Sequence, residues 1–209
     1  MKLKKIASLA LAGIMAVSML TACGESGKKE EDPSSSEVTT VSGAAAALNN
    51  ALSQNKDVVK FEDDSNLDKN LEAYFKLHPI KGDEWAESNY GKIGEDSNDY
   101  AELKNVIGSN YIGLENYEGV VGSDSDRYND KKAAVIGMFN TKVYTQAEAL
   151  KMVGKAIDNF DYAEDTTDTD DGKEFTYSGK ASVLEVKSEG GTASVWVVVA
   201  VVTRGYEKV

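Results

Sequence analysis

The chain of 209 residues has few side chains of the kinds that act as nucleophiles or general bases. It contains one His, His78, and one Cys, Cys23. A Ser-His-Asp or Cys-His device would have to use His78, and no Gly-x-Ser-x-Gly elbow occurs in the sequence. His78 ends the apolar stripe of an expected helix, where an imidazole suits the negative end of the helix dipole. We therefore predict a structural His78 and no catalytic residue.

Two acidic segments raise the question of a calcium site. If Gly172 is the glycine of an EF-hand-type loop within residues 164–172, two of the first three ligand positions fall on Thr167 and Thr169. Residues 124–130 contain three Asp but lack the glycine and the closing Glu. A single Cys and a single His also exclude a Cys cage and a His-rich site. A solvated acidic loop is the better interpretation, and we predict no metal and no cofactor.

The 35 Asp and Glu residues leave one catalytic alternative open. A muramidase or glycosidase needs two carboxylates about 5–10 Å apart in a cleft, and some pair among so many acids will meet that distance. No glycosidase motif is present. The glycine pairs, such as Gly190-Gly191, lack the strand-loop-helix context of a phosphate loop. A cell-wall hydrolase is therefore the least favoured of the functions considered below.

Aromatic residues are concentrated in the irregular middle of the chain, beside Asn, Asp and Gly. Exposed aromatics on polar loops can stack on sugar faces or anchor a peptide partner. The alternative is that each tyrosine fills a small core and sends its hydroxyl to water. The residues of the candidate binding surface are Trp85, Tyr90, Tyr100, Tyr111 and Tyr117.

Net charge narrows the range of partners. The whole chain carries −12, and residues 1–22 contain three Lys and no acid. Without that segment the chain has 20 basic and 35 acidic residues, a net charge of −15. Such a surface repels nucleic acid and anionic lipid heads, whereas it attracts cations and basic partners. We therefore exclude nucleic acid as a partner.

The N-terminal segment has the pattern of an export signal. Lys2, Lys4 and Lys5 are followed by an apolar run of 15 residues, 6–20, which is shorter than the roughly 20 residues of a spanning helix. Residues 20–23 then read Leu-Thr-Ala-Cys. This arrangement resembles the lipobox signal peptide of bacterial lipoproteins, and the resemblance covers residues 1–23 only.

The resemblance implies that the chain is cut before Cys23. The thiol of Cys23 would then accept a diacylglyceryl group, and the new N-terminus could receive a further acyl chain such as palmitate. Membrane lipid thus becomes a partner through Cys23, because two or more acyl chains hold a protein firmly on a bilayer. The implied location is the extracytoplasmic face of the cell membrane.

Composition divides the chain into three parts. Residues 1–22 are the expected lipoprotein signal peptide. Residues 23–42 are rich in Gly, Ser, Thr, Glu and Lys, and they predict a disordered stalk because they cannot bury enough surface to offset the entropy of ordering. Residues 43–209 predict a single globular domain of about 165 residues.

Periodicity predicts the elements of the first half of that domain. The alanine-rich stretch 44–54 predicts a helix, and residues 58–61 predict a short strand. A second helix over 67–78 has its apolar residues on one face, with Ser65 as its expected cap. A further helix is expected near residues 100–107.

The second half gives a clearer pattern. Residues 133–143 predict a strand, and Thr145 with Glu148 predicts a capping box at the start of a helix on which Asp158 faces solvent. Strands over 174–187 and 192–204 form a long hairpin, and the second is apolar on both faces, as expected of a central strand. We predict an α+β fold, with helices packed on a mixed or antiparallel sheet and a C-terminal β-α-β-β unit.

These patterns favour a non-enzymatic binding or interaction module at the cell surface. Its ligand would be cell-wall polymer, an envelope protein or a host-surface molecule. The alternative from another class is a small solute-binding lipoprotein that hands a cation or a basic solute to a transporter. The expected body is small for a two-lobed binding protein, which counts against this alternative.

Overall fold

In the computed structural model of the chain, the described residues belong to one compact unit, Asp32–Val209. They are residues 37–80, 90–91, 102–108, 111–112, 131–160, 162, 173–188 and 193–208. The strands are β1 Val38–Thr40, β2 Lys60–Asp63, β3 Tyr90–Gly91, β4 Tyr111–Ile112, β5 Lys131–Asn140, β6 Lys173–Lys187 and β7 Ser194–Lys208. The helices are α1 Ala44–Ala51, α2 Ser65–Leu77, α4 Leu103–Ile107 and α5 Gln146–Asp158.

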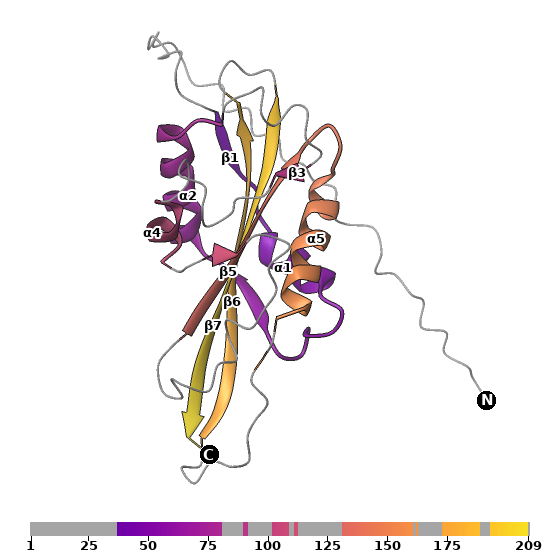
Figure 1. The fold of residues 1–209 in the computed structure, drawn as a ribbon, viewed down its shortest axis with the longest axis vertical. Helices are drawn as coiled ribbons and strands as arrows, with labels where there is room; N and C mark the ends of the chain where they lie inside the picture. Colours follow the sequence, from indigo (N-terminus) through magenta and orange to yellow (C-terminus); the bar gives the residue numbers. More distant parts are fainter. Residues whose placement is uncertain are drawn as a thin grey trace, which may run out of the picture. The chain divides into compact units, whose positions relative to one another are not determined.

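The strands form one sheet in the order β1-β6-β7-β5-β3, with β2 also paired to β6 and β4 also paired to β5. The central strand β7 is antiparallel to both of its long neighbours, β6 and β5, whereas β2 and β4 run parallel to their partners. The sheet is therefore mixed, and β6 and β7 form the long C-terminal hairpin (Figure 1). The predicted α+β class and its β-α-β-β unit, β5-α5-β6-β7, are confirmed.

Strand β7 lies in the middle of this sheet because its side chains are apolar on both faces. Val198, Ala200 and Val202 pack in one core cluster with α1 and α5. Val197 and Val199 pack in a second cluster with α2 and α4. Figure 1 shows α2 and α4 on one side of the sheet and α1 and α5 on the other. Burial of each Val side chain contributes about 1.5–3 kcal/mol, so the continuous valine run fixes the three-layer arrangement.

The folded body begins earlier than residue 43. Strand β1 lies within the segment expected to be a stalk and pairs antiparallel with β6, Val38 opposite Val186 and Thr40 opposite Leu184. The carbonyl of Glu37 also accepts a hydrogen bond from the N–H of Lys187, at 2.9 Å. The predicted boundary was wrong because three β-branched residues inside a Ser- and Gly-rich stretch carry too little pattern to indicate a strand. Residues 1–36 lie outside the described residues.

Helix boundaries follow from local chemistry. The cap of α2 is Asp64 rather than the predicted Ser65, because the Asp64 carboxylate accepts hydrogen bonds from the N–H groups of Asn66 and Leu67. At α5 the predicted capping box of Thr145 and Glu148 is confirmed. Strand β5 ends three residues before the predicted 143.

Candidate functional site

The predicted binding aromatics are only partly within the described residues. Trp85, Tyr100 and Tyr117 lie outside them, as do Cys23 and the acidic segments 124–130 and 164–172.

Two of the predicted aromatic positions do fall on described backbone. Tyr90 begins β3, opposite Phe139 of β5, and Tyr111 begins β4, opposite Ala134 of the same strand. Both tyrosines therefore belong to short strands on the outer edge of β5, about 16 Å apart along it at the usual rise of a strand. The sequence offered no signal for this shared edge.

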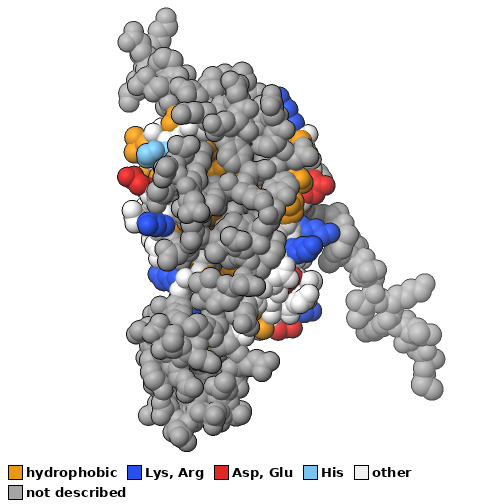
Figure 2. Space-filling model, in the orientation of Figure 1, with side chains coloured by type: hydrophobic (Ala, Val, Ile, Leu, Met, Phe, Trp, Pro, Cys, Tyr) orange, Lys and Arg blue, Asp and Glu red, His pale blue; other side chains and the backbone are white. Residues whose placement is uncertain are grey.

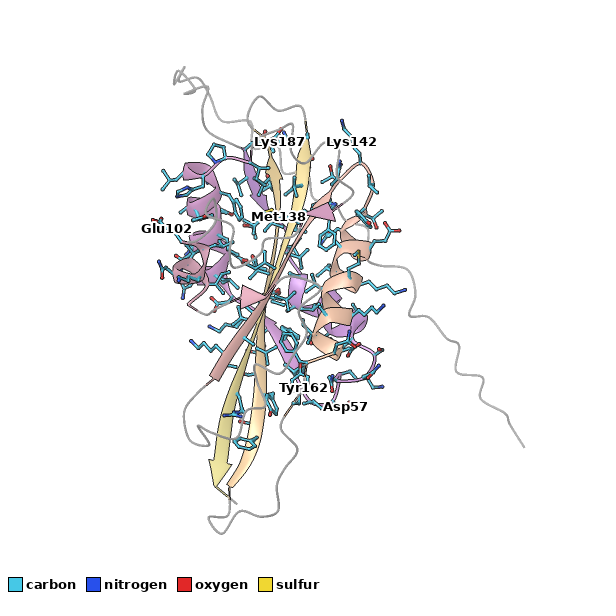
Figure 3. The ribbon with its side chains drawn as sticks, in the orientation of Figure 1. Asp57, Glu102, Met138, Lys142, Tyr162 and Lys187 are labelled. Carbon is cyan, nitrogen blue, oxygen red and sulfur yellow. The ribbon has the colours of Figure 1, made fainter. Side chains whose placement is uncertain are left out.

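Tyrosines whose side chains are described pack against the core. Tyr74 is buried, and Tyr144, Tyr162 and Tyr177 are partly buried against the cluster beneath α1 and α5. The Tyr162 ring meets Tyr177 edge-on at 5.0 Å, and its hydroxyl donates to the carbonyl of Ile157 at 3.3 Å. Burial, then the Asp158 charge and Tyr177, raise the pKa of Tyr162. Figure 3 shows Tyr162 beyond the end of α5. These four tyrosines pack against the core.

One group of polar side chains joins α2 to β1 and β6. Three of its carboxylates recur every fourth residue, on the cap and on one face of α2, so they align along the helix. Its remaining members are hydroxyls and an ammonium group from the two strands. These six residues form the edge cluster: Thr40, Asp64, Asp68, Glu72, Lys180 and Ser182.

Each carboxylate of the edge cluster has a partner within the fold. Asp64 pairs with Lys180 as well as capping α2. Asp68 Oδ1 accepts a hydrogen bond from the Ser182 hydroxyl at 2.6 Å, and Ser182 is fully buried. Glu72 accepts from the Thr40 hydroxyl and lies 3.6 Å from the ammonium of Lys76. The cluster therefore fastens α2 to the outer edge of the sheet.

The pKa values of Asp64 and Asp68 shift in opposite directions along the row. The hydrogen bond from Lys180 lowers the pKa of Asp64, although burial opposes it. Burial raises the pKa of Asp68, and the charges of Asp63, Asp64 and Glu72 raise it further against the Ser182 hydrogen bond. The row thus concentrates negative charge at the edge of the sheet.

A second polar centre lies at the end of α5, and it corrects the prediction that Asp158 faces solvent. Asp158 is only 7% exposed. Its Oδ2 accepts from the N–H and the hydroxyl of Ser53, at 2.8 and 2.7 Å. Its Oδ1 accepts from the N–H groups of Gln54 and Asn55, both at 3.0 Å. The Asn55 amide returns a hydrogen bond to the Asp158 carbonyl at 2.8 Å.

These bonds make Asp158 a structural carboxylate. Burial alone would raise the pKa of Asp158, but the hydrogen bonds from Asn55, Ser53 and Gln54 together hold it below its ordinary value. The three N–H groups of the turn after α1 form a concavity that suits an anion, and the protein's own carboxylate fills it. Because this partner is more than 100 residues away in the sequence, no local pattern could indicate it.

His78 lies at the C-terminal end of α2, where the sequence placed it. The His78 ring stacks on the Tyr74 ring with centroids 4.5 Å apart. The backbone N–H of His78 donates to the backbone carbonyl of Tyr74 at 2.8 Å. The ring is half-buried and reaches the surface (pale blue in Figure 2). His78 therefore packs against Tyr74 at the end of the helix.

Comparisons with protein-family models, with curated proteins and with solved structures find no match for this chain. Within the described parts of the chain, no group of His, Cys, Asp or Glu is arranged to hold a metal ion. No helix among the described residues is long and apolar enough to cross a membrane.

Proposed function

We propose that this protein is a lipoprotein anchored on the extracytoplasmic face of the membrane and that its folded body is a non-enzymatic binding module. The observation that carries the proposal is the Leu-Thr-Ala-Cys sequence at residues 20–23, directly behind a basic and then an apolar segment. Cys23 is the only cysteine, so its thiol has no competing disulfide role. The ligand class is cell-wall polymer, an envelope protein or a host-surface molecule.

The roles of four described carboxylates, Asp64, Asp68, Glu72 and Asp158, support binding over catalysis at these positions. A general acid or base must exchange its proton with a substrate, so its carboxylate cannot be saturated by the fold. Asp158 receives four hydrogen bonds from one turn. Asp64, Asp68 and Glu72 each hold α2 or the sheet edge. These four carboxylates therefore hold structural elements together through their hydrogen bonds and ion pairs.

Co-sedimentation with purified cell wall tests the binding role. The purified mature protein, in nonionic detergent, is spun with wall in calcium and in EDTA, and the turbidity of the wall suspension is followed in parallel. Binding in both buffers identifies the wall as ligand, and binding only in calcium assigns a metal site to the acidic segments. Loss of turbidity would contradict the non-enzymatic role. No sedimentation in either buffer removes wall polymer from the ligand class.

A further inference from the structure

Two short strands, β2 and β1, pair with the outer edge of β6. They differ in whether the backbone groups on their other side have hydrogen-bond partners. β2 pairs parallel with β6 over residues 178–181, and β1 pairs antiparallel over residues 184–186. A strand at a sheet edge presents N–H and C=O groups that can pair with another chain. Whether these N–H and C=O groups already have hydrogen-bond partners therefore shows which part of the edge is open to another chain.

Strand β2 is closed by a side chain. The Asn49 amide of α1 donates to the carbonyl of Phe61 at 2.9 Å and accepts from the N–H of Phe61 at 2.8 Å. This reciprocal pair occupies the backbone groups of Phe61 that face away from β6. Asn49 thus takes the place that a neighbouring strand would fill.

Strand β1 is open. The N–H of Lys187 donates to the carbonyl of Glu37, and the N–H of Val41 donates to the carbonyl of Val183, both at 2.9 Å. Because hydrogen-bonded pairs alternate along an antiparallel ladder, Thr39 also bonds inward, and the backbone groups of the two residues beside it point outward. Those residues are Val38 and Thr40. Within the described part of the chain, no hydrogen bond reaches their outward N–H and C=O groups.

The surroundings of this open edge are acidic. Glu72 accepts a hydrogen bond from the Thr40 hydroxyl and is 31% exposed, so its carboxylate lies beside the edge. Glu37, which precedes the strand, is 66% exposed and pairs with Lys187 at 2.6 Å; Lys187 is labelled in Figure 3 at the end of β6. Three of the nearby carboxylates pair with lysines, Glu37 with Lys187, Asp64 with Lys180 and Glu72 with Lys76, and Asp68 stands in the same row with a hydroxyl as its partner.

We propose that the edge of β1 is a docking site for an extended, lysine- or arginine-bearing segment of another protein, which adds to the sheet as a further strand. The outward groups of Val38 and Thr40 supply the main-chain hydrogen bonds, and Glu72 supplies charge complementarity. A second copy of this chain is the weaker occupant, because two chains without residues 1–22, each of net charge −15, repel each other.

The probe is a fluorescent peptide of about eight residues that alternates Lys and Val, since alternation puts one residue type on each face of a strand. It is titrated into the purified mature protein in detergent at physiological ionic strength, with fluorescence anisotropy as the readout. Two control peptides accompany it: an alternating Glu-Val peptide, and the Lys-Val peptide methylated at every backbone nitrogen. The methylated peptide keeps its charge but cannot donate a main-chain hydrogen bond.

Two variants at one position separate the backbone from the side chain. Thr40→Pro removes the outward N–H while leaving the inward bonds of β1, and proline is tolerated at edges whose N–H faces solvent. Thr40→Val keeps that N–H and removes only the hydroxyl that contacts Glu72. We expect Thr40→Pro to weaken Lys-Val binding about tenfold or more and Thr40→Val to weaken it less. Equal urea midpoints for the two variants establish that both are folded.

The proposal is supported if the Lys-Val peptide binds and the methylated and Glu-Val peptides do not. It is overturned if the Lys-Val peptide fails to bind, or if the methylated peptide binds equally well, because attraction would then be charge alone. The methylated peptide gives this result on the unmodified protein, even if Thr40→Pro does not fold. A dimer in sedimentation equilibrium that Thr40→Pro abolishes would assign the edge to a second copy and also overturn the proposal.

This inference rests on the proposed binding function, to which it adds a class of partner. The peptide titration contains no cell wall, and the wall sedimentation contains no peptide. Failure of the titration removes the docking edge while leaving wall binding intact, and failure of the sedimentation does the reverse.

Discussion

The region around α1 and strand β1 differ in how their outward backbone groups are hydrogen-bonded. Around α1, side chains cap them: Asp158 takes three N–H groups of the following turn, and Asn49 takes both groups of Phe61. At β1, the outward groups of Val38 and Thr40 have no described hydrogen bond. This difference, within the described residues, is the observation behind the proposed docking site at β1.

Removal of the Asp158 carboxylate should break the closed region most severely. Asp158→Ala leaves three N–H groups and the Ser53 hydroxyl without their acceptor, so we expect the free energy of unfolding to fall by about 3 kcal/mol. Urea denaturation followed by circular dichroism measures the loss. Asp57→Ala is the matched control, because Asp57 is exposed in the same turn region and should change stability by less than about 0.5 kcal/mol. Equal effects of the two substitutions would contradict the structural role of Asp158.

Asn49→Ala should open the β2 edge. It removes two hydrogen bonds from Phe61, and we expect a loss of about 2 kcal/mol in the free energy of unfolding. Asn50→Ala, at the exposed neighbouring position of the same helix, is the control and should be nearly neutral. Hydrogen exchange should also show faster exchange of the Phe61 amide in Asn49→Ala alone. Unchanged protection of that amide would mean that Asn49 does not close the edge.

Lowering the pH should change the stability contributions of Asp158 and Asp68 in opposite directions. The folded-state pKa of Asp158 lies below the ordinary 3.8, so its contribution to stability is complete above about pH 4 and is lost as the pH falls through the folded pKa. We expect the stability difference between the natural protein and Asp158→Ala to shrink by about 1 kcal/mol or more as the pH falls below 4. Urea midpoints measured from pH 7 to pH 2.5 test this. A difference independent of pH would show that packing, not the charge, is responsible.

Asp68 should show the reverse dependence with the smallest effect. Burial and neighbouring acids raise its pKa, so the charged form costs stability above the folded pKa, and this cost disappears as the pH falls through it. Asp68→Asn keeps an acceptor for Ser182 and should stabilise the protein by about 0.5 kcal/mol at pH 7 and not at pH 3. Glu62→Gln, on the exposed β2 position, is the control for a simple change in net charge. Destabilisation by Asp68→Asn at pH 7 would contradict the crowding of the row.

The parts of this fold that were predictable are those encoded by neighbours in the sequence. The valine run of β7 indicates burial on both faces, and Thr145 with Glu148 indicates a helix start. The edge strand β1 and the Asp158 contacts depend on partners that are roughly 100 or more residues away. Periodicity carries no information about such pairings, so the sequence pattern places Asp158 in solvent and β1 in the stalk.

The same limit applies to the candidate sites. The aromatic surface was predicted from composition, and of its five residues the structure places the backbone of Tyr90 and Tyr111, both at the outer edge of β5. Composition does not indicate the edge of β1, because that edge is recognised only from the alternation of its hydrogen bonds with β6. Lipid attachment at Cys23 stays a prediction from the local signal.

Mass spectrometry of the mature N-terminal peptide, extracted from membranes of the producing cells, tests the central claim most directly. We predict that the peptide begins at Cys23 and carries the mass of a diacylglyceryl group, and that a Cys23→Ser chain yields no lipidated peptide. A mature peptide that begins elsewhere, or an unmodified Cys23 in the membrane fraction, would contradict the anchored module.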